Sequence, residues 1–466
     1  MIPTFAVVGH PNKGKSSIVA TLAEDERLAI GPTPGTTRRA AYHTFSIDDQ
    51  PQYVLVDTPG FQRAGAVLEW LESRATTASA RPALVAEFVA AHAEDPRFVD
   101  ECELLKPIVE GAGILYVVDG SKPYGAEYEL EMQILQWTGQ PRMALINLIG
   151  EEDHQDQWRQ ALDQYFSLVR VFDAVAADFD TRVALLKAFG ELDQQWRASL
   201  DRAVAALIEE RAQRRTRSAA EIAACLIDSL EMTERAPLAN GADVKPLENK
   251  LMETLQKRLR KREDRARTAV QSFYRHQALA RQEPGQTLID TDLFTEAGWE
   301  LFGLSRQRLL ITGALTGALA GGGIDVLLGG ASLALGAGIG ALIGGASAWF
   351  GGGELARIKV LGEPLGGQII QVGPVKAPNF PWVLLGRAWL HHQLVAERNH
   401  AYRAAITLAI SGEQNLMDTL PDTLARDLAR TFGKLGRGAS PELRAALSAQ
   451  IDQVLACRLT DTPQPL

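Results

Sequence analysis

The feature that most constrains the fold of this chain is a glycine-rich stretch close to its N-terminus. The sequence Gly9-His10-Pro11-Asn12-Lys13-Gly14-Lys15-Ser16 fits the pattern G-x-x-x-x-G-K-[ST]. The apolar run Thr4–Gly9 leads into it and a helical pattern follows, which is the strand, loop and helix that this pattern needs. Glycine lets backbone amides turn inward around a phosphate, and the positive end of the next helix strengthens the attraction. The stretch therefore predicts a phosphate-binding loop in an α/β sheet.

The residue types of this loop predict separate roles in holding a nucleoside triphosphate. We expect Lys15 to reach the β- and γ-phosphate oxygens and Ser16 to ligate Mg²⁺. Ser17 is expected beside the α-phosphate. The other expected nucleotide contacts in the loop are Gly9, Asn12, Lys13 and Gly14. A glycine turn formed by chance is the alternative, and it leaves the order of strand, loop and helix unexplained.

Two further sequence pieces follow the loop in the order that nucleotide hydrolysis requires. Asp57-Thr58-Pro59-Gly60 ends the apolar run Tyr53–Val56, which would place Asp57 beside the metal and the Gly60 amide at the γ-phosphate. Upstream, Pro34-Gly35-Thr36-Thr37-Arg38 lies in a predicted loop, in which Thr37 is the first candidate for a Mg²⁺ ligand and Thr36 the second. Either piece alone could be a polar turn. The expected metal ligands are Ser16, Thr37 and Asp57, and the expected catalytic residues are Lys15, Thr37 and Gly60.

These three motifs together resemble the Era/TrmE-type branch of the translation-factor class of P-loop GTPases. The resemblance covers about the first 180 residues. The remainder is similar to an uncharacterised C-terminal domain of the DUF3482 type that is found behind such GTPases. The resemblance implies GTP and GDP as ligands, hydrolysis of GTP to GDP and phosphate with Mg²⁺, and a role as a nucleotide-dependent switch. A scaffold that binds nucleotide and hydrolyses it slowly is the alternative.

The residue after Gly60 departs from the Ras-like arrangement, in which a glutamine orients the attacking water. Phe61 stands at this place, and its side chain cannot orient water. The resemblance implies a substitute, because in this branch the loop asparagine can hold a potassium ion, and Asn12 matches that asparagine. A cation there would neutralise charge that develops between the phosphates. The alternative is that Asn12 only stabilises the turn.

The base-recognition box that the resemblance implies, Asn-Lys-x-Asp, is incomplete. After the strand Arg142–Ile146 the sequence is Asn147-Leu148-Ile149-Gly150. Gly150 has no carboxylate to accept hydrogen bonds from guanine, which should cost about 1.5–3 kcal/mol per bond. Asp153 could supply the acid or be an exposed side chain, and the Ala174 amide is expected to meet the base carbonyl. The choice between guanine and adenine therefore stays open in the sequence.

The pattern of apolar runs predicts several domains. Residues 1–198 are expected to form the P-loop GTPase domain, a mostly parallel doubly wound sheet with a helical insertion at about 62–107. A mainly α-helical C-terminal domain should follow. The expected parts are a helical connector at 199–308 with a turn-rich linker at Arg235–Val244 and a basic helix at about 246–283, a Gly/Ala-rich hairpin at 309–353, and a mainly helical region at 354–466. The expected strands are Thr4–Gly9, Tyr53–Asp57, Gly113–Asp119, Arg142–Asn147 and Leu168–Phe172.

The segment 309–353 is almost free of charge and predicts contact with a membrane. Its second apolar run, Val326–Phe350, is about 25 residues long, which is enough to cross a bilayer as a helix. The basic helix upstream suits anionic lipid headgroups. We expect a chain that is cytoplasmic and peripheral to, or inserted at, the cytoplasmic face of the inner membrane. A membrane protein as partner, a hairpin buried in protein and a Gly-rich oligomer interface are the alternatives.

The remaining signals limit other classes of function. A net charge of −9 argues against general nucleic-acid binding, so we do not expect nucleic acid as a partner, and an RNA- or ribosome-associated GTPase is kept as an alternative. Three dispersed cysteines indicate a reducing compartment and no metal site. His391 and His392 are expected on the polar side of an amphipathic helix. Gly433-Lys434-Leu435-Gly436 is expected to end a helix.

Overall fold

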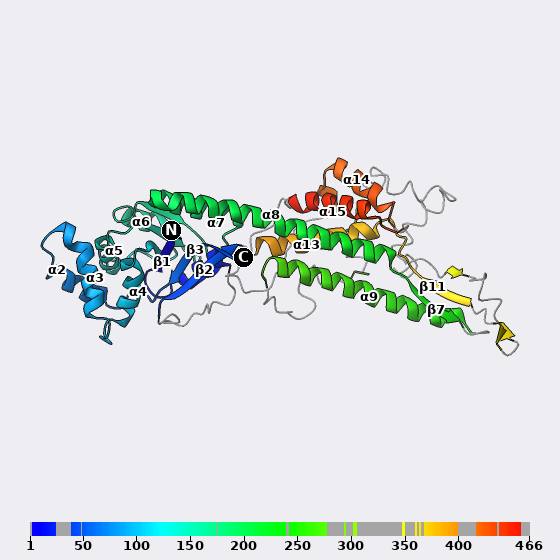
Figure 1. Cartoon of the computed structure of the whole chain (residues 1–466), viewed down its shortest axis with the longest axis horizontal. Coiled ribbons are helices and arrows are strands. Elements are labelled where there is room, and N and C mark those ends of the chain that lie inside the picture. Colours follow the sequence, from blue (N-terminus) through cyan, green and yellow to red (C-terminus); the bar gives the residue numbers. More distant parts are fainter. Residues whose placement is uncertain are drawn as a thin grey trace. The chain divides into compact units, whose positions relative to one another are not determined.

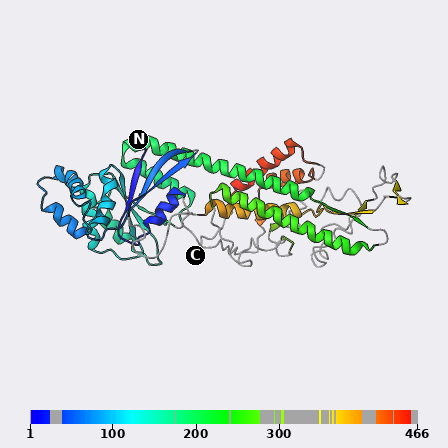
Figure 2. The same ribbon diagram turned by 60° about the horizontal axis from the view of Figure 1, so that its bottom comes forward.

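The computed structural model of this chain forms two compact units (Figures 1 and 2). Unit 1 comprises Met1–Arg211 with Glu397–Ala404, and unit 2 comprises Ala212–Ala396 with Ala405–Leu466. The structure describes residues 2–24, 39–47, 49–174, 176–238, 242–276, 293–294, 302–304, 347–349, 359–360, 363–364, 368–398, 416–435 and 438–457. Thr36, Thr37 and most of 309–353 lie outside these residues, and the expectations placed on them stay predictions.

Unit 1 is built on a six-stranded sheet with the order β2-β3-β1-β4-β5-β6. All neighbouring strands are parallel except β2 and β3, which pair antiparallel. This arrangement confirms the predicted α/β sheet. The strands are β1 (Thr4–Val8), β2 (Ala41–Ile47), β3 (Gln50–Asp57), β4 (Gly113–Asp119), β5 (Arg142–Asn147) and β6 (Leu168–Val171). Strand β2 was not predicted from the sequence, because its half-exposed residues give it no continuous apolar run.

Helices cover both faces of this sheet (Figures 1 and 2). The alternation along β4 shows this directly, because Ile114 and Tyr116 belong to one apolar cluster and Leu115 and Val117 to the other. The helices of unit 1 are α1 (Lys15–Ala23), α2 (Ala64–Glu72), η1 (Ala78–Ala80), α3 (Arg81–Ala91), α4 (Val99–Val109), α5 (Glu127–Trp137), α6 (Gln155–Leu162) and α7 (Phe179–Leu192). Because α2, α3 and α4 occupy the stretch between β3 and β4, it is mostly helical, as predicted.

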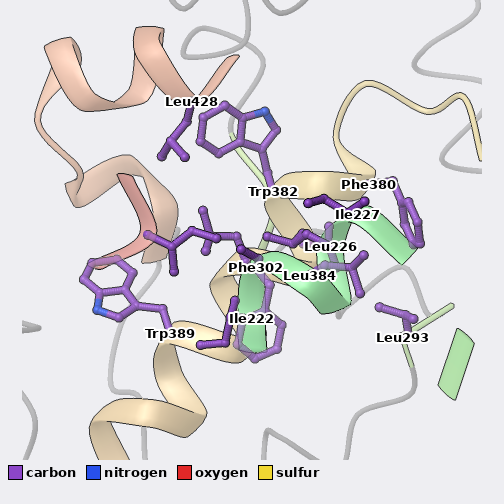
Figure 3. Packing of buried hydrophobic residues seen from close by; sticks show 14 of the residues in the cluster. Ile222, Leu226, Ile227, Leu293, Phe302, Phe380, Trp382, Leu384, Trp389 and Leu428 are labelled. Atoms are coloured by element: carbon purple, nitrogen blue, oxygen red, sulfur yellow. The ribbon is translucent and has the colours of Figure 1, made fainter. Parts of the chain in front are cut away.

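Unit 2 is mainly helical. It contains the C-terminal part of α8 (Gln194–Glu231), together with α9 (Val244–Phe273), α13 (Phe380–Glu397), η6 (Leu416–Thr419), α14 (Asp422–Phe432) and α15 (Pro441–Ala456). Its core lies around α13, whose Trp382, Leu384 and Trp389 meet Ile222 and Leu226 of α8 and Leu428 of α14 in one apolar cluster (Figure 3). α9 buries Leu251, Leu255 and Leu259 on one face, as its spacing of four residues requires. The Gly433 turn ends α14, as expected.

A small antiparallel sheet completes unit 2 and corrects two expectations. Its order is β7 (Glu234–Leu238), β11 (Gln368–Val372) and β8 (Ser347–Trp349), and β9 (Lys359–Val360) pairs separately with β10 (Glu363–Pro364). The expected linker at Arg235–Val244 is therefore wrong in its first half, which is strand β7 bonded to β11. The apolar run expected to be helical as far as Phe350 ends in strand β8, which also pairs with β11.

Two further expectations differ from the structure. The boundary at residue 198 falls inside the continuous helix α8, and unit 1 extends to Arg211. His391 and His392 are not on a polar helix face, because α13 is buried nearly all round and these side chains are 4% and 2% exposed. Their ring nitrogens have Gln271 and Tyr274 as hydrogen-bond partners. In the part of the chain that the structure describes, no three His, Cys, Asp or Glu side chains are grouped as a metal site.

Candidate nucleotide-binding site

The loop between β1 and α1 has the backbone that its glycines predict. Gly9, Asn12 and Gly14 all have positive φ, at 139°, 62° and 82°. A side chain at Gly9 would place its Cβ 2.4 Å from the Val117 carbonyl oxygen, and one at Gly14 would come 2.2 Å from Asn147 Nδ2. The loop therefore packs directly on the ends of the neighbouring strands, and only glycine fits at both places. Gly14 also precedes the first turn of α1, whose free amides favour an anion.

Lys15 is the first residue of α1, and its side chain reaches back to this loop. Its Nζ donates hydrogen bonds of 3.0 Å to the carbonyl oxygens of Gly9 and His10. The side chain is 8% exposed, and burial lowers the pKa of its ammonium to about 8, although Asp57 acts in the opposite direction. A phosphate inside the loop would supply the negative charge that this buried cation needs.

The structure brings Ser16, Asp57 and Gly60 to the same loop. Ser16 Oγ donates a 2.8 Å hydrogen bond to Asp57 Oδ2, and Asp57 is 3% exposed at the end of β3. Gly60 lies against the loop, because a Cβ there would be 2.6 Å from the backbone nitrogen of Pro11. A hydroxyl and a carboxylate oxygen are ligands that Mg²⁺ accepts, so this pair fits the predicted metal site. Thr37, the third expected ligand, lies outside the described residues.

Asn147 joins three loops at the carboxyl ends of the strands. Its Nδ2 donates to the Lys13 carbonyl oxygen at 3.1 Å, and its Oδ1 accepts from the Ala174 amide at 3.0 Å. The Ala174 amide is therefore bonded within the protein, which corrects the expectation that it meets a base. Asp153 Oδ1 accepts from the Gln155 amide at 3.0 Å, so Asp153 acts in the turn that opens α6.

A buried polar network under the loop was missed by sequence reasoning. Lys13 is 4% exposed and its Nζ lies 3.8 Å from Asp119 Oδ2; burial lowers the pKa of Lys13, and Asp119 opposes this shift. His10 Nδ1 lies 2.9 Å from Glu131 Oε1, and the Tyr116 hydroxyl donates to Glu131 Oε2 at 2.8 Å. The side chain of Lys13 is thus used inside the protein, and its expected nucleotide contact stays a prediction for the backbone of the loop. The available signal was Glu131, a single acid on the apolar face of α5.

A hollow elsewhere in unit 1 is separate from this loop. It has a volume of about 260 Å³ and is lined by Ile2, Thr4, Tyr42, Pro107, Glu110, Gly111, Ala112 and Trp196. These residues include none of the loop residues and none of the groups around Ser16 and Asp57. The polar groups that suit a triphosphate therefore lie at the carboxyl ends of β1 and β3 and not in this hollow. Of the helices in the described ranges, none is both long and apolar enough to cross a bilayer.

Comparison with known proteins matches two family models to this chain. The 50S ribosome-binding GTPase family matches residues 4–148, which include the loop, Asp57, Gly60 and Asn147. The family described as a domain of unknown function, DUF3482, matches residues 159–459. This second match covers more than half of the chain.

Curated relatives and solved structures are similar over shorter parts. GTPase Der of Halalkalibacterium halodurans is 46% identical over 68 residues, and GTPase Der of Cupriavidus taiwanensis is 48% identical over 68 residues. Each match covers 15% of this chain and 15% of the relative. The crystal structure of an Aquifex aeolicus Era variant bound to GDP and AlF4⁻ is 19% identical and covers 41% of this chain and 56% of its own, with a TM-score of 0.30. The chain belongs to the DUF3482 family and carries, at its N-terminus, a P-loop GTPase domain of the translation-factor class.

Proposed function

We propose that this protein binds GTP with Mg²⁺, hydrolyses it to GDP and phosphate, and acts as a nucleotide-dependent switch. The observation that carries the proposal is the hydrogen bond between Ser16 and Asp57 beside the buried ammonium of Lys15. A hydroxyl and a carboxylate for the metal then adjoin a cation for the β- and γ-phosphates. The Gly60 amide is the proposed γ-phosphate contact, and Thr37 the proposed third ligand of the metal.

Hydrolysis would depend on cations more than on a side chain that orients water. Phe61 is 1% exposed and packs in the apolar cluster with Val67 and Leu105, so its ring is part of the core. Lys15 and the first amides of α1 would stabilise negative charge as the bond to the γ-phosphate breaks. We propose that Asn12, at the positive-φ position of the loop, also holds K⁺ there. Equal rates of hydrolysis in sodium and potassium buffers would contradict this part.

The main test is a phosphate-release assay on the full-length protein with GTP and Mg²⁺. Lys15→Ala should reduce turnover by at least about a hundredfold, because it removes the cation that the transferred phosphoryl group needs. Lys187→Ala, which changes an exposed lysine of α7, is the matched control and should leave turnover unchanged. Tight nucleotide binding without phosphate release in the wild type would favour the slowly hydrolysing scaffold instead.

Membrane docking at the cytoplasmic face is the second part of the proposal, and a basic stripe on α9 supports it. The stripe consists of Lys250, Lys257, Lys261 and Arg265, which are exposed and spaced by seven, four and four residues. This spacing puts all four on one side of α9, away from the buried side with Leu255 and Leu259. Such a stripe suits anionic headgroups, and the apolar sequence 309–353 belongs to the same unit.

Flotation with lipid vesicles tests the docking proposal. The full-length protein should bind vesicles that contain phosphatidylglycerol more tightly than vesicles of phosphatidylcholine alone. The double variant Lys257→Glu, Lys261→Glu should reduce that difference by at least about tenfold, at roughly 1 kcal/mol for each basic residue near the surface. Equal binding to both vesicles would overturn the proposal. RNA binding that weakens with salt and survives removal of 309–353 would favour an RNA-associated GTPase instead.

A further inference from the structure

Helix α4, directly before β4, carries a buried acid among apolar neighbours. Glu101 is 1% exposed, and the adjacent buried positions of the helix are Cys102, Leu104 and Leu105. A carboxylate removed from water is costly unless hydrogen-bond donors replace the water. The partners of Glu101 therefore identify the segment for which this acid is placed.

Those partners are backbone amides just after the Asp57–Gly60 motif. Glu101 Oε1 accepts hydrogen bonds from the amides of Gln62 at 2.9 Å and Arg63 at 2.6 Å. Arg63 is the cap of α2, so the carboxylate also meets the positive end of that helix. Gly60 packs on the backbone of Pro11. The carboxylate thus holds the chain two residues beyond Gly60, whose amide is the proposed contact of the γ-phosphate.

A second glutamate of the same helix bonds to the backbone that leads into β2. Glu103 Oε2 accepts a 2.9 Å hydrogen bond from the amide of Ala40. Ala40 comes directly before β2 and three positions after Thr37 in the sequence. Two carboxylates on one rigid helix therefore bond to the backbone that follows each of the two motifs expected at the γ-phosphate.

We propose that Glu101 and Glu103 are positioning residues that hold both γ-phosphate-facing segments through α4. This inference rests on the proposed function. Neither residue touches nucleotide; each acts through backbone amides, Glu101 on the segment with Gly60 and Glu103 on the segment that follows Thr37. GDP has no γ-phosphate, so its affinity does not depend on this placement, whereas that of a triphosphate does. Because one helix carries both contacts, displacement of one segment is transmitted to the other.

The test compares affinities of the full-length protein for GTPγS and for GDP, both with Mg²⁺. Glu101→Gln keeps the shape of the side chain and removes its charge at a buried position. Glu103→Gln makes the same change at a partly exposed position, where it disturbs the packing less. Each should lower the ratio of GTPγS affinity to GDP affinity by about tenfold, since hydrogen bonds to a charged group are worth more than neutral ones. GDP affinity should stay within about twofold of the wild type. Glu87→Gln, on the exposed side of α3, is the matched control.

The double variant tests the coupling. If α4 acts as one unit, Glu101→Gln with Glu103→Gln lowers the affinity ratio by clearly less than the product of the single effects. Independent effects that multiply would overturn the coupling. Equal losses for GTPγS and GDP, or unchanged ratios in both single variants, would overturn the positioning role. The assay measures binding and not turnover. A wild type that binds GTPγS without releasing phosphate from GTP would contradict the proposed hydrolysis, and the affinity ratios of the variants would still decide the positioning role.

Discussion

The two units use buried polar residues in opposite ways. In unit 1, Lys15, Asp57 and Asn147 are buried at the start of α1 and at the ends of β3 and β5. They bond to backbone atoms of the loop between β1 and α1 or to the Ser16 hydroxyl. In unit 2, the buried Arg387 and the largely buried Glu263 lie in the middle of long helices and bond to each other between α13 and α9. Burial of a charge is therefore no guide to a ligand site by itself. A buried charge indicates a ligand site when it lies beside a loop that can surround an anion, as Lys15 does.

In unit 2, Glu263 pairs with two arginines. Arg387 is 3% exposed, and its Nε donates to Glu263 Oε1 at 2.7 Å. Arg267 bonds to the same oxygen at 2.7 Å, and both cations hold the pKa of Glu263 below its usual range although burial acts against them. Nearby, the Tyr274 hydroxyl lies 2.9 Å from His392 Nε2. These partners fasten α9 to α13 within unit 2.

The largest expected effect is on the free energy of unfolding, and it tests whether the ion pairs of unit 2 are structural. Glu263→Leu leaves the buried Arg387 and the partly exposed Arg267 without their shared acid and should lower the free energy of unfolding by about 3–5 kcal/mol. Urea denaturation followed by tryptophan fluorescence measures this. Adding Arg387→Met should recover part of the loss, because it removes one of the uncompensated charges. Nucleotide affinity of the folded fraction should stay at the wild-type value, and a fall in it would contradict the separation of roles.

On the unit 1 side, Asn147→Ala should loosen the nucleotide loop. The change removes the hydrogen bonds that the Asn147 side chain makes to the Lys13 carbonyl and the Ala174 amide, which costs about 1–3 kcal/mol per bond. Titration with a fluorescent GDP should show affinity weaker by at least about tenfold, since the tie between the loops after β1, β5 and β6 is lost. The exposed Asn249→Ala in α9 serves as the control. Unchanged affinity would mean that Asn147 does not organise the loop.

A smaller effect on nucleotide preference should show whether the loop after β5 contacts the base. The double change Leu148→Lys, Gly150→Asp rebuilds the full base-recognition box beside Asn147. It should raise the preference for GTP over ITP, which lacks the 2-amino group, by about 1.5–3 kcal/mol. Competition binding of the two nucleotides gives this number. If the preference of the variant equals that of the wild type, the base does not lie against Gly150.

The smallest expected effect is the pH dependence that His391 gives to unit 2. Burial lowers the pKa of His391 to about 3 from 6.5, with help from Arg267 and His392, so the ring is neutral in the folded protein. The unfolded chain takes up a proton as the pH falls through 6.5, which favours unfolding, and stability is lost progressively from there toward pH 3. At about pH 5.5 the loss should be about 1.4 kcal/mol. His391→Gln should remove this share of the slope in urea denaturation at several pH values; identical slopes would exclude it.

The phosphate-binding loop of unit 1 could be predicted because few residue types can adopt its backbone conformation. Gly9 and Gly14 are required by positive φ and close packing, and Asp57 by its place at the end of a strand. The partners of Glu101, Glu103 and Glu131 could not be predicted, since a single acid on a helix does not specify which distant amide or ring it meets. These contacts are decided by the packing of helices on the sheet.

Unit 2 was harder to predict for two physical reasons. Strand β7 contains Pro237 and precedes Asn240 and Gly241, so its local sequence is typical of a turn. Its pairing partner, β11, lies far along the chain and gives no local signal. His391 and His392 were expected on a solvated helix face. α13 is apolar on nearly every side, and such a helix is buried all round, so its polar residues must find partners inside.

The pairing of β7 with β11 also sets an order of events during synthesis. About 130 residues separate the two strands, so at about 5–20 residues per second β7 waits roughly ten seconds for its partner to be translated. During that time its edge could join the same strand of a neighbouring nascent chain. Pro237 removes one amide donor from this edge, and the charges of Glu234 and Arg235 discourage such pairing. The nucleotide-binding sheet, whose last strand ends at Val171, can close long before the helical unit does.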